Sequence, residues 1–329
     1  MSSEQQPAVH GANSDDAVVQ EARAQLTDVE ATAVSVSKFR VAGASLRRPD
    51  GSPFFDASFD AQLCNAVLPQ EEQAALLGLF QDHMVAVLAM RTAEIDEHVM
   101  AAVGGGSSSG GGGANGSSSG SGANGSSRGV RQLVILGAGL DMRAWRLPLE
   151  VAGPGSSSDS GSGSSSGVTV FELDSGSTES LKTRVMGAAP PPSRCRRVFV
   201  QVDLEAPEQA LERLRAAGWD PAQPSVFVME GLIGYLTAAA GDALFRRLRS
   251  SAAPGSRLVL TTPPSAAWRD ELQRTRGARL HHTTFEEPEQ TLARVVAAGW
   301  SGAELRTAEA LAAKYGLAEN RQGVIVAVV

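Results

Sequence analysis

The chain has 329 residues, of which 42% are apolar and 20% charged, as expected for a globular protein of one large or two small domains. Its net charge of −7 disfavours a nucleic-acid partner, because attraction to phosphate requires a positive field. We also expect no membrane span, disulfide framework or metal, because no apolar run reaches about 18 residues, the two cysteines are far apart and the five histidines lack metal-ligand spacing.

The first part of the chain changes character near residue 28. Residues 1–27 are polar and acidic, so we expect them to be disordered, and they show neither the apolar nor the Arg-rich pattern of a targeting signal. We therefore predict a cytoplasmic protein. From 28 to 103 apolar residues recur three and four apart, which is typical of amphipathic helices. This stretch is predicted to form a helical N-terminal cap.

Two tracts, 104–127 and 153–167, consist almost entirely of Gly, Ser, Ala and Asn. They have almost no side chains to bury, so nothing offsets the entropy lost on ordering them. We predict flexible inserts. One precedes the first predicted strand and the other precedes the second, which would place both at the sheet edge opposite the one where ligands bind.

Short aliphatic runs alternate with helical stretches after the first tract. The runs are 132–136, 168–173, 196–202, 225–230 and 257–262. Such alternation is typical of a parallel sheet covered by helices on both faces. Helices at 286–299 and 307–316 and strands at 303–307 and 323–329 follow. The sequence therefore predicts a doubly wound α/β domain over 128–329, with a last strand that runs antiparallel.

The first predicted strand ends in a glycine turn, Gly137-Ala138-Gly139. The dinucleotide fingerprint would place a third glycine where Met142 stands. The turn alone therefore leaves two interpretations open: a nucleotide site, or a plain turn that requires positive φ.

Acidic residues end the next three strands of the predicted sheet: Asp174, Asp203 and Glu230. Asp174 follows Gly139 by 35 residues, or by about 20 without the second tract, which is the spacing of an acid that binds ribose hydroxyls. Three carboxylates at neighbouring strand ends do not suit a pyrophosphate. They suit an adenosine that carries positive charge, as in the sulfonium compound S-adenosylmethionine. For any one acid, a solvated or helix-capping role is the alternative.

Four segments together carry a family resemblance. LVILGAGLDMRAWRL, VFELD, VQVDL and VFVMEGLIGYL occur in this order, and they resemble the leucine carboxyl methyltransferase family, including its large bacterial branch. The resemblance covers about residues 85–317. It implies a Rossmann-like class I methyltransferase sheet and S-adenosyl-L-methionine as cofactor. One departure is Met142, where the family usually has Thr.

The resemblance also implies a set of cofactor-binding residues: Arg91, Gly137, Gly139, Asp174, Asp203, Leu204 and Glu230. Arg91 would pair with the methionine carboxylate, since a guanidinium offers a planar fork for such a group. Asp174 would bind the ribose, and Asp203 with Leu204 would flank the adenine. Lys38 is an ambiguous match for a further cation of the family.

Glu230 and Tyr235 are the predicted catalytic residues, and Tyr235 is expected to line the methyl-transfer pocket unless it serves core packing. Methyl transfer from a sulfonium is an in-line displacement that depends mainly on positioning. A carboxylate acceptor needs no general base, whereas an alcohol or phenol does, and Glu230, His281 and His282 are the candidates. We predict O-methyl transfer by a monomer to a small molecule or a protein C-terminal carboxylate.

Two alternatives belong to other classes of protein. An NAD(P)-dependent Rossmann reductase is disfavoured by the absent third glycine and because neither Tyr235 nor Tyr315 has a lysine four residues later. A non-catalytic protein that binds S-adenosylmethionine stays open on the sequence alone.

Overall fold

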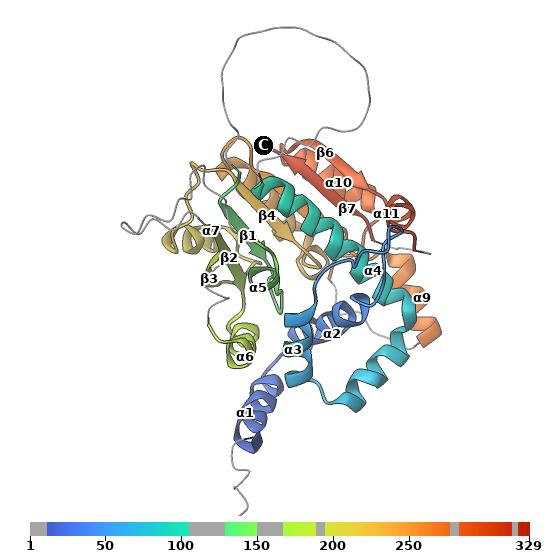
Figure 1. Cartoon of the computed structure of the whole chain (residues 1–329). Helices are drawn as coiled ribbons and strands as arrows, with labels where there is room; N and C mark the ends of the chain where they lie inside the picture. Colours follow the sequence, from blue (N-terminus) through green and yellow to red (C-terminus); the bar gives the residue numbers. More distant parts are fainter. Residues whose placement is uncertain (1–11, 105–128, 150–166, 189–194, 277–282, 318–321) are drawn as a thin grey trace, which may run out of the picture.

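The computed structural model of the protein describes residues 12–104, 129–149, 167–188, 195–276, 283–317 and 322–329. Its strands in this part are β1 (Gln132–Leu136), β2 (Val168–Asp174), β3 (Cys195–Gln201), β4 (Ser225–Met229), β5 (Arg257–Thr261), β6 (Ser301–Arg306) and β7 (Val324–Val328). They form one sheet in the order β3-β2-β1-β4-β5-β7-β6 (Figure 1). The reversal of strand order beside β1 is the point at which open α/β sheets bind their ligands.

Strands β1 to β5 are parallel, and β7 runs antiparallel to both β5 and β6. This confirms the predicted doubly wound sheet with an antiparallel last strand. Every residue of β1 and β4 is buried, which is why these strands have almost no polar positions. Parallel pairing brings the carboxyl ends of β3, β2, β1 and β4 to one edge of the sheet.

Helices cover both faces of the sheet. The helices that follow β1 in the described part of the chain are α5 (Arg143–Arg146), α6 (Gly176–Met186), α7 (Pro207–Ala216), α8 (Ala238–Ser251), α9 (Ala266–Arg276), α10 (Pro288–Ala297) and α11 (Ala308–Tyr315), with a 3₁₀ turn η1 (Ile233–Tyr235) after β4. Alternate residues of β1 point to opposite faces. Val134 packs with α7, α8 and α10, while Leu133 packs with the N-terminal helices.

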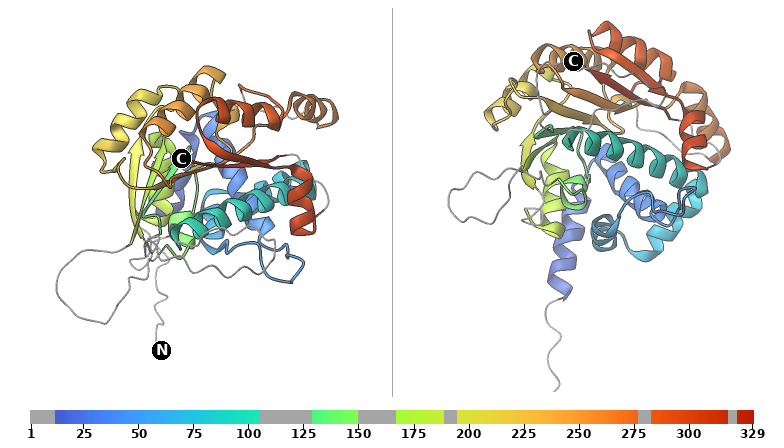
Figure 2. Two further views of the ribbon diagram at one scale, coloured as in Figure 1. Left: turned by 90° about the horizontal axis from the view of Figure 1, so that it is seen from above. Right: turned by 45° about the horizontal axis from the view of Figure 1, so that its top comes forward.

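The helices predicted over 28–103 are α2 (Asp28–Gly43), α3 (Ser58–Val67) and α4 (Gln70–Val103). Thr27 and Glu30 form a capping box that starts α2. Helix α4 packs against β4, β5 and β7, and Figure 2 shows it lying along the sheet with α2 beside it. The N-terminal helices are therefore joined to the sheet through α4.

The prediction of disorder over 1–27 is wrong for residues 12–24, which form helix α1 (Ala12–Ala24). Val19 and Ala22 are buried, three residues apart, and α1 packs against α6 and α3. Arg23 forms an ion pair with Glu72. Two small apolar contacts within a polar stretch give little periodicity, so the docking of this helix was not apparent from the sequence.

The two Gly/Ser tracts lie almost wholly outside the described residues, and their flexibility stays a prediction. Within the described part of the chain, no helix is both long and apolar enough to cross a membrane.

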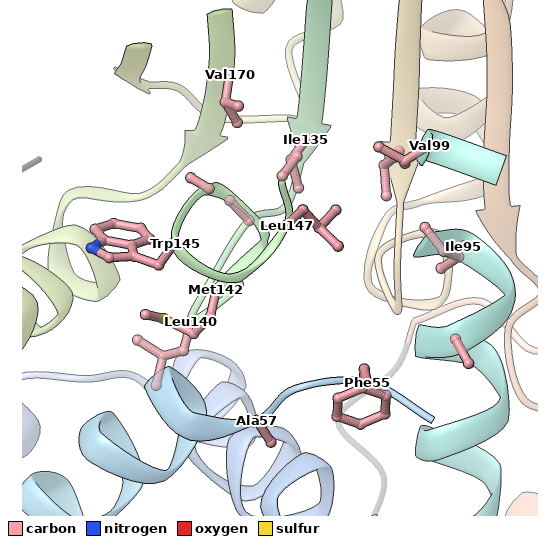
Figure 3. Packing of buried hydrophobic residues seen from close by; sticks show 14 of the residues in the cluster. Phe55, Ala57, Ile95, Val99, Ile135, Leu140, Met142, Trp145, Leu147 and Val170 are labelled. Carbon is pink, nitrogen blue, oxygen red and sulfur yellow. The ribbon is translucent and has the colours of Figure 1, made fainter. Parts of the chain in front are cut away.

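The segment after β1 is anchored by apolar packing. Figure 3 shows Leu140 and Met142 of this segment turned toward the N-terminal helices, whereas Trp145 lies on the side of α6, where Lys182 stands over its ring. All three are buried, with Met142 only 1% exposed. The side chain that replaces the threonine of the family therefore packs in the core.

Candidate functional site

The turn after β1 requires glycine. Gly137 has φ 67° and Gly139 has φ 47°, in the left-handed region that side chains disfavour. The backbone N–H groups of Gly137 and Ala138 both donate to the carbonyl of Leu173, at 2.9 and 3.1 Å. A Cβ atom on Gly137 would lie 2.8 Å from Cδ1 of Leu232. The turn is thus held against the end of β2.

Asp174, the last residue of β2, is bonded directly to this turn. Its carboxylate accepts the backbone N–H of Gly139 and, at 2.6 Å, that of Ser175. Burial raises the pKa of Asp174, and the nearby carboxylate of Glu30 adds to the rise, while the two backbone N–H groups oppose it. The structure therefore places a partly buried carboxylate beside the glycine turn, where the sequence predicts the ribose.

Asp203 and Leu204 follow the neighbouring strand, β3. Asp203 is exposed and accepts the N–H of Glu205 at 2.9 Å, and Leu204 is buried. A pocket of about 280 Å³ opens here, and its lining includes Asp203, Ser175 and Gln201 at the strand ends and Arg213 of α7. This pocket adjoins Asp174 through the next residue, Ser175, but its lining does not include Glu230.

Glu230, directly after β4, contacts two guanidinium groups. Its Oε1 accepts Nε of Arg91 at 3.0 Å and the hydroxyl of Thr92 at 3.1 Å. Its Oε2 lies 2.6 Å from Nη2 of Arg143. The side chain is 5% exposed, and the two arginines hold the pKa of Glu230 far below its usual range despite burial. Arg91 and Glu230, predicted separately, thus meet in one ion pair.

This pair is part of a larger group that we call the buried charge cluster. Its members are Arg40, Arg91, Arg143, Arg146, Asp60, Asp96, Asp141 and Glu230, all buried side chains. One arginine, Arg143, contacts three of the acids: Asp96 at 2.7 Å, Asp141 and Glu230. Four cations and four anions leave the cluster without net charge, which is the condition under which charges can be buried.

Helix α2 forms a wall over this edge of the sheet. Arg40 donates to the carbonyl of Leu140, directly after the glycine turn, at 2.7 Å. Glu30 accepts a hydrogen bond from the Ser175 hydroxyl. The Cβ of Ala33 lies 3.2 Å from the position that a Cβ on Gly139 would occupy. Helix α2 therefore contacts the segment after β1 and Ser175, the residue that follows Asp174.

The remaining predicted residues are placed as follows. Tyr235 lies in η1, where its hydroxyl donates to that of Thr32 on α2 at 3.2 Å, and burial raises its pKa. Lys38 donates instead to Gln73 of α4. His281 and His282 lie outside the described residues. Among the described residues, no group of His, Cys, Asp and Glu is arranged to hold a metal ion.

Sequence reasoning missed the partners that organise the site. Arg143 lies within the motif segment RAWR but was given no role, and Arg40 and Gln322 were not singled out. Gln322 accepts a hydrogen bond from Arg91 at 3.0 Å. The residues that meet here are separated by up to 231 positions, so no local pattern could reveal them.

The strand order, the glycine turn and the acids at one sheet edge define the class of protein as the Rossmann-like methyltransferase fold. A crystal structure of a "putative methyltransferase" from Thermobifida fusca aligns with a TM-score of 0.51, covering 90% of this chain and 93% of that one. Its sequence identity is 14%, so this similarity concerns the fold.

Sequence comparisons show which family part of the chain resembles. The model of the leucine carboxyl methyltransferase family matches residues 123–249. Two relatives bear the name "Putative S-adenosyl-L-methionine-dependent methyltransferase": one from Mycobacterium avium (strain 104), 33% identical over 242 residues, and one from Mycobacteroides abscessus, 43% identical over 136. The matches cover 70% and 41% of this chain. The chain spans 64% and 39% of the lengths of these relatives. Over residues 123–249 the chain is therefore similar to the leucine carboxyl methyltransferase family, which its motifs also resemble.

Proposed function

We propose that the protein transfers the methyl group of S-adenosyl-L-methionine to an oxygen atom, and that the acceptor is a carboxylate. The observation that carries this proposal is the arrangement along one sheet edge. Asp174 is bonded to the glycine turn at the end of β2, and Glu230 holds Arg91 at the end of β4. Similarity to the leucine carboxyl methyltransferase family and the names of the relatives support the same donor.

The residues fit such a donor. Asp174 uses each carboxylate oxygen for one backbone N–H, and each oxygen keeps a lone pair that a ribose hydroxyl could use. Gly231, with φ 69°, lies against Nη2 of Arg91, and a Cβ there would approach this nitrogen to 3.4 Å. Glycine thus leaves room beside the one guanidinium nitrogen to which neither Glu230 nor Gln322 is bonded.

The chemistry supplied by the bound donor is a methyl group on positive sulfur, whose S–C bond breaks as the acceptor O–C bond forms. The protein then has to hold the two reactants in line, a positioning effect that can contribute about 7–11 kcal/mol. Rigid anchors suit this task. At least two polar contacts fix each of the three anchors, which are the glycine turn, Asp174 and Arg91.

The acid–base properties of Glu230 and Tyr235 favour a carboxylate acceptor. An efficient general base has a pKa near the working pH. The pKa of Glu230 lies far below that range and the pKa of Tyr235 lies above its ordinary value, so neither is matched to the task. A carboxylate carries its own lone pair and needs no base. In this proposal Glu230 positions Arg91, and Tyr235 lines the wall toward α2.

Thermal unfolding with added S-adenosylmethionine, S-adenosylhomocysteine or NADH tests the donor. We expect the two sulfur compounds to stabilise the protein, by about 2.7 kcal/mol at a hundred times Kd. Stabilisation by NADH alone would contradict the proposal and favour the reductase.

Labelled donor incubated with lysate tests the acceptor. A carboxyl methyl ester releases its label as volatile methanol in mild alkali, whereas an ether keeps it. We expect alkali-labile product with the wild type and, at donor concentrations below Kd, less product with Asp174→Ala. Separation by size tells a protein C-terminus from a small molecule. Alkali-stable label would leave methyl transfer standing and exclude the carboxylate.

A further inference from the structure

Gln322 lies just before β7 and is 5% exposed. Its side chain bridges the N-terminal helices and the sheet. The amide oxygen accepts Nη1 of Arg91 at 3.0 Å, and the amide nitrogen donates to the carbonyl of Thr262 at 3.3 Å. Because the two ends of the amide have different partners, only one orientation of the group satisfies both.

The backbone behind Gln322 is fixed equally well. Thr262 and Gly323 exchange hydrogen bonds: the Thr262 N–H donates to the Gly323 carbonyl, and the Gly323 N–H donates to the Thr262 hydroxyl, each at 3.0 Å. A Cβ on Gly323 would lie 2.7 Å from the side chain of Leu305. Gln322 therefore projects toward Arg91 from a rigid junction of β5 and β7.

The Arg91 guanidinium is consequently held from two sides. Its Nε donates to Glu230 and its Nη1 to Gln322, both at 3.0 Å. Its Nη2 takes part in neither of these bonds and lies beside Gly231, 3.4 Å from the position that a Cβ there would occupy. This leaves one donor group in a fixed direction at the edge where the methyl donor would bind.

The choice of an amide at position 322 has an electrostatic consequence. The buried charge cluster is already balanced, with four arginines and four acids. A neutral amide orients Arg91 without adding an anion, whereas a glutamate there would give the cluster an excess negative charge. An excess negative charge would repel a ligand carboxylate within the low dielectric of the interior.

We propose that Gln322 is a positioning residue that holds Arg91 toward the carboxylate of the methyl donor, and that the bond between them selects ligands carrying that carboxylate. This inference rests on the proposed function. It goes further by assigning discrimination at the amino-acid end of the donor to a side chain that does not itself touch the ligand.

Calorimetry with two ligands tests the inference. S-adenosylhomocysteine carries the amino-acid carboxylate, and 5′-methylthioadenosine shares the adenosine and sulfur but lacks the amino-acid part. For Gln322→Leu we expect S-adenosylhomocysteine to bind about tenfold more weakly, with less than about twofold change for 5′-methylthioadenosine. Gln132→Leu, which removes another buried, hydrogen-bonded glutamine, is the matched control and should not separate the two ligands.

Gln322→Glu adds a readout that a purely structural role would not give. With the glutamate ionised at pH 8, S-adenosylhomocysteine should bind more weakly than to Gln322→Leu. Its affinity relative to wild type should recover as the pH is lowered and the glutamate becomes neutral. An equal loss for both ligands, or no loss for either, would overturn the role of Gln322. A wild type that binds 5′-methylthioadenosine but not S-adenosylhomocysteine would overturn it too, and one that binds neither would overturn the proposed function itself.

Discussion

Asp174 and Glu230 stand at the same edge of the sheet, on the two strands that flank β1, yet their surroundings are opposite. Glu230 contacts the guanidinium groups of Arg91 and Arg143, which hold its pKa far below the usual range. Asp174 is bonded to backbone N–H groups and lies near another carboxylate, Glu30, and its pKa is raised.

The two ends differ in whether cations of the protein compensate the charge of the carboxylate. The charge at the Glu230 end is compensated before any ligand arrives, so this end contributes to folding. The Asp174 end keeps a partly buried carboxylate to which no cation of the described residues is directly bonded, and such a group costs stability until partners satisfy it. A ligand with two hydroxyls would supply those partners, which is the usual relation between a destabilised site and its function.

The largest expected effect is at the Glu230 end. Arg143→Met removes the guanidinium that contacts Asp96, Asp141 and Glu230, and leaves buried carboxylates with too few cations. We expect a loss of about 3–5 kcal/mol in the free energy of unfolding, because breaking a buried pair costs far more than the pair itself contributes. Urea denaturation measures it.

The control for this variant is Arg247→Ala. Arg247 pairs with Glu208 at 2.9 Å, but both side chains are more than half exposed, at 55% and 53%. Because solvent screens such exposed pairs, we expect Arg247→Ala to lose far less stability than Arg143→Met. If the two variants lost similar stability, the cluster would not be the structural element that the comparison makes it.

At the Asp174 end the expected effect is on affinity. Asp174→Ala removes a charged acceptor, and each charged hydrogen bond to a ribose hydroxyl contributes about 1.5–3 kcal/mol, or at least about tenfold in Kd. Calorimetry with S-adenosylhomocysteine measures this loss. Unchanged affinity would mean that the ribose lies elsewhere and that the two ends do not divide their roles.

The turn that joins the two ends should show a smaller effect on stability. Gly137→Ala forces a side chain into φ 67°, which costs about 1–2 kcal/mol. Gly78→Ala in α4, where no described atom outside the local helix backbone lies within 4 Å of the added Cβ, should instead stabilise by about 0.5–1 kcal/mol. Thermal unfolding of both variants tests whether the turn, rather than any glycine, is sensitive.

The sequence predicted the sheet because its strands are nearly continuous aliphatic runs, such as 132–136, that match a buried parallel strand directly. It predicted Asp174 because a strand end fixes where an acid lies. It could not predict that Arg143 would compensate Glu230, because nothing local distinguishes a buried arginine from the solvated majority. Gln322 was missed for the same reason: its partner, Arg91, is set by tertiary packing.

The smallest predicted effect concerns pH. In the proposed complex a ribose hydroxyl donates to the Asp174 carboxylate, so affinity for S-adenosylhomocysteine should fall as the pH drops through the raised pKa of Asp174. Protonation of Asp174 favours the folded protein without ligand, because this carboxyl holds its proton more tightly when folded.

The contribution of Glu230 to stability is lost only below the ordinary pKa of a glutamate, about 4.3, as the pH falls through the lowered pKa of Glu230. Binding should therefore weaken before the protein unfolds.

Glu30→Gln sharpens this expectation. The glutamine oxygen can still accept the Thr27 N–H, and its amide nitrogen can donate to the Ser175 hydroxyl oxygen in place of the bond that Glu30 accepts. The variant removes the negative charge that helps to raise the pKa of Asp174. The fall in affinity should then move to lower pH, while the affinities at pH 7 stay within about twofold of each other. Glu208→Gln, on the exposed face of α7, should leave the profile unchanged. If Glu30→Gln also left it unchanged, the charge beside Asp174 would not control the ribose end, and the contrast with Glu230 would rest on burial alone.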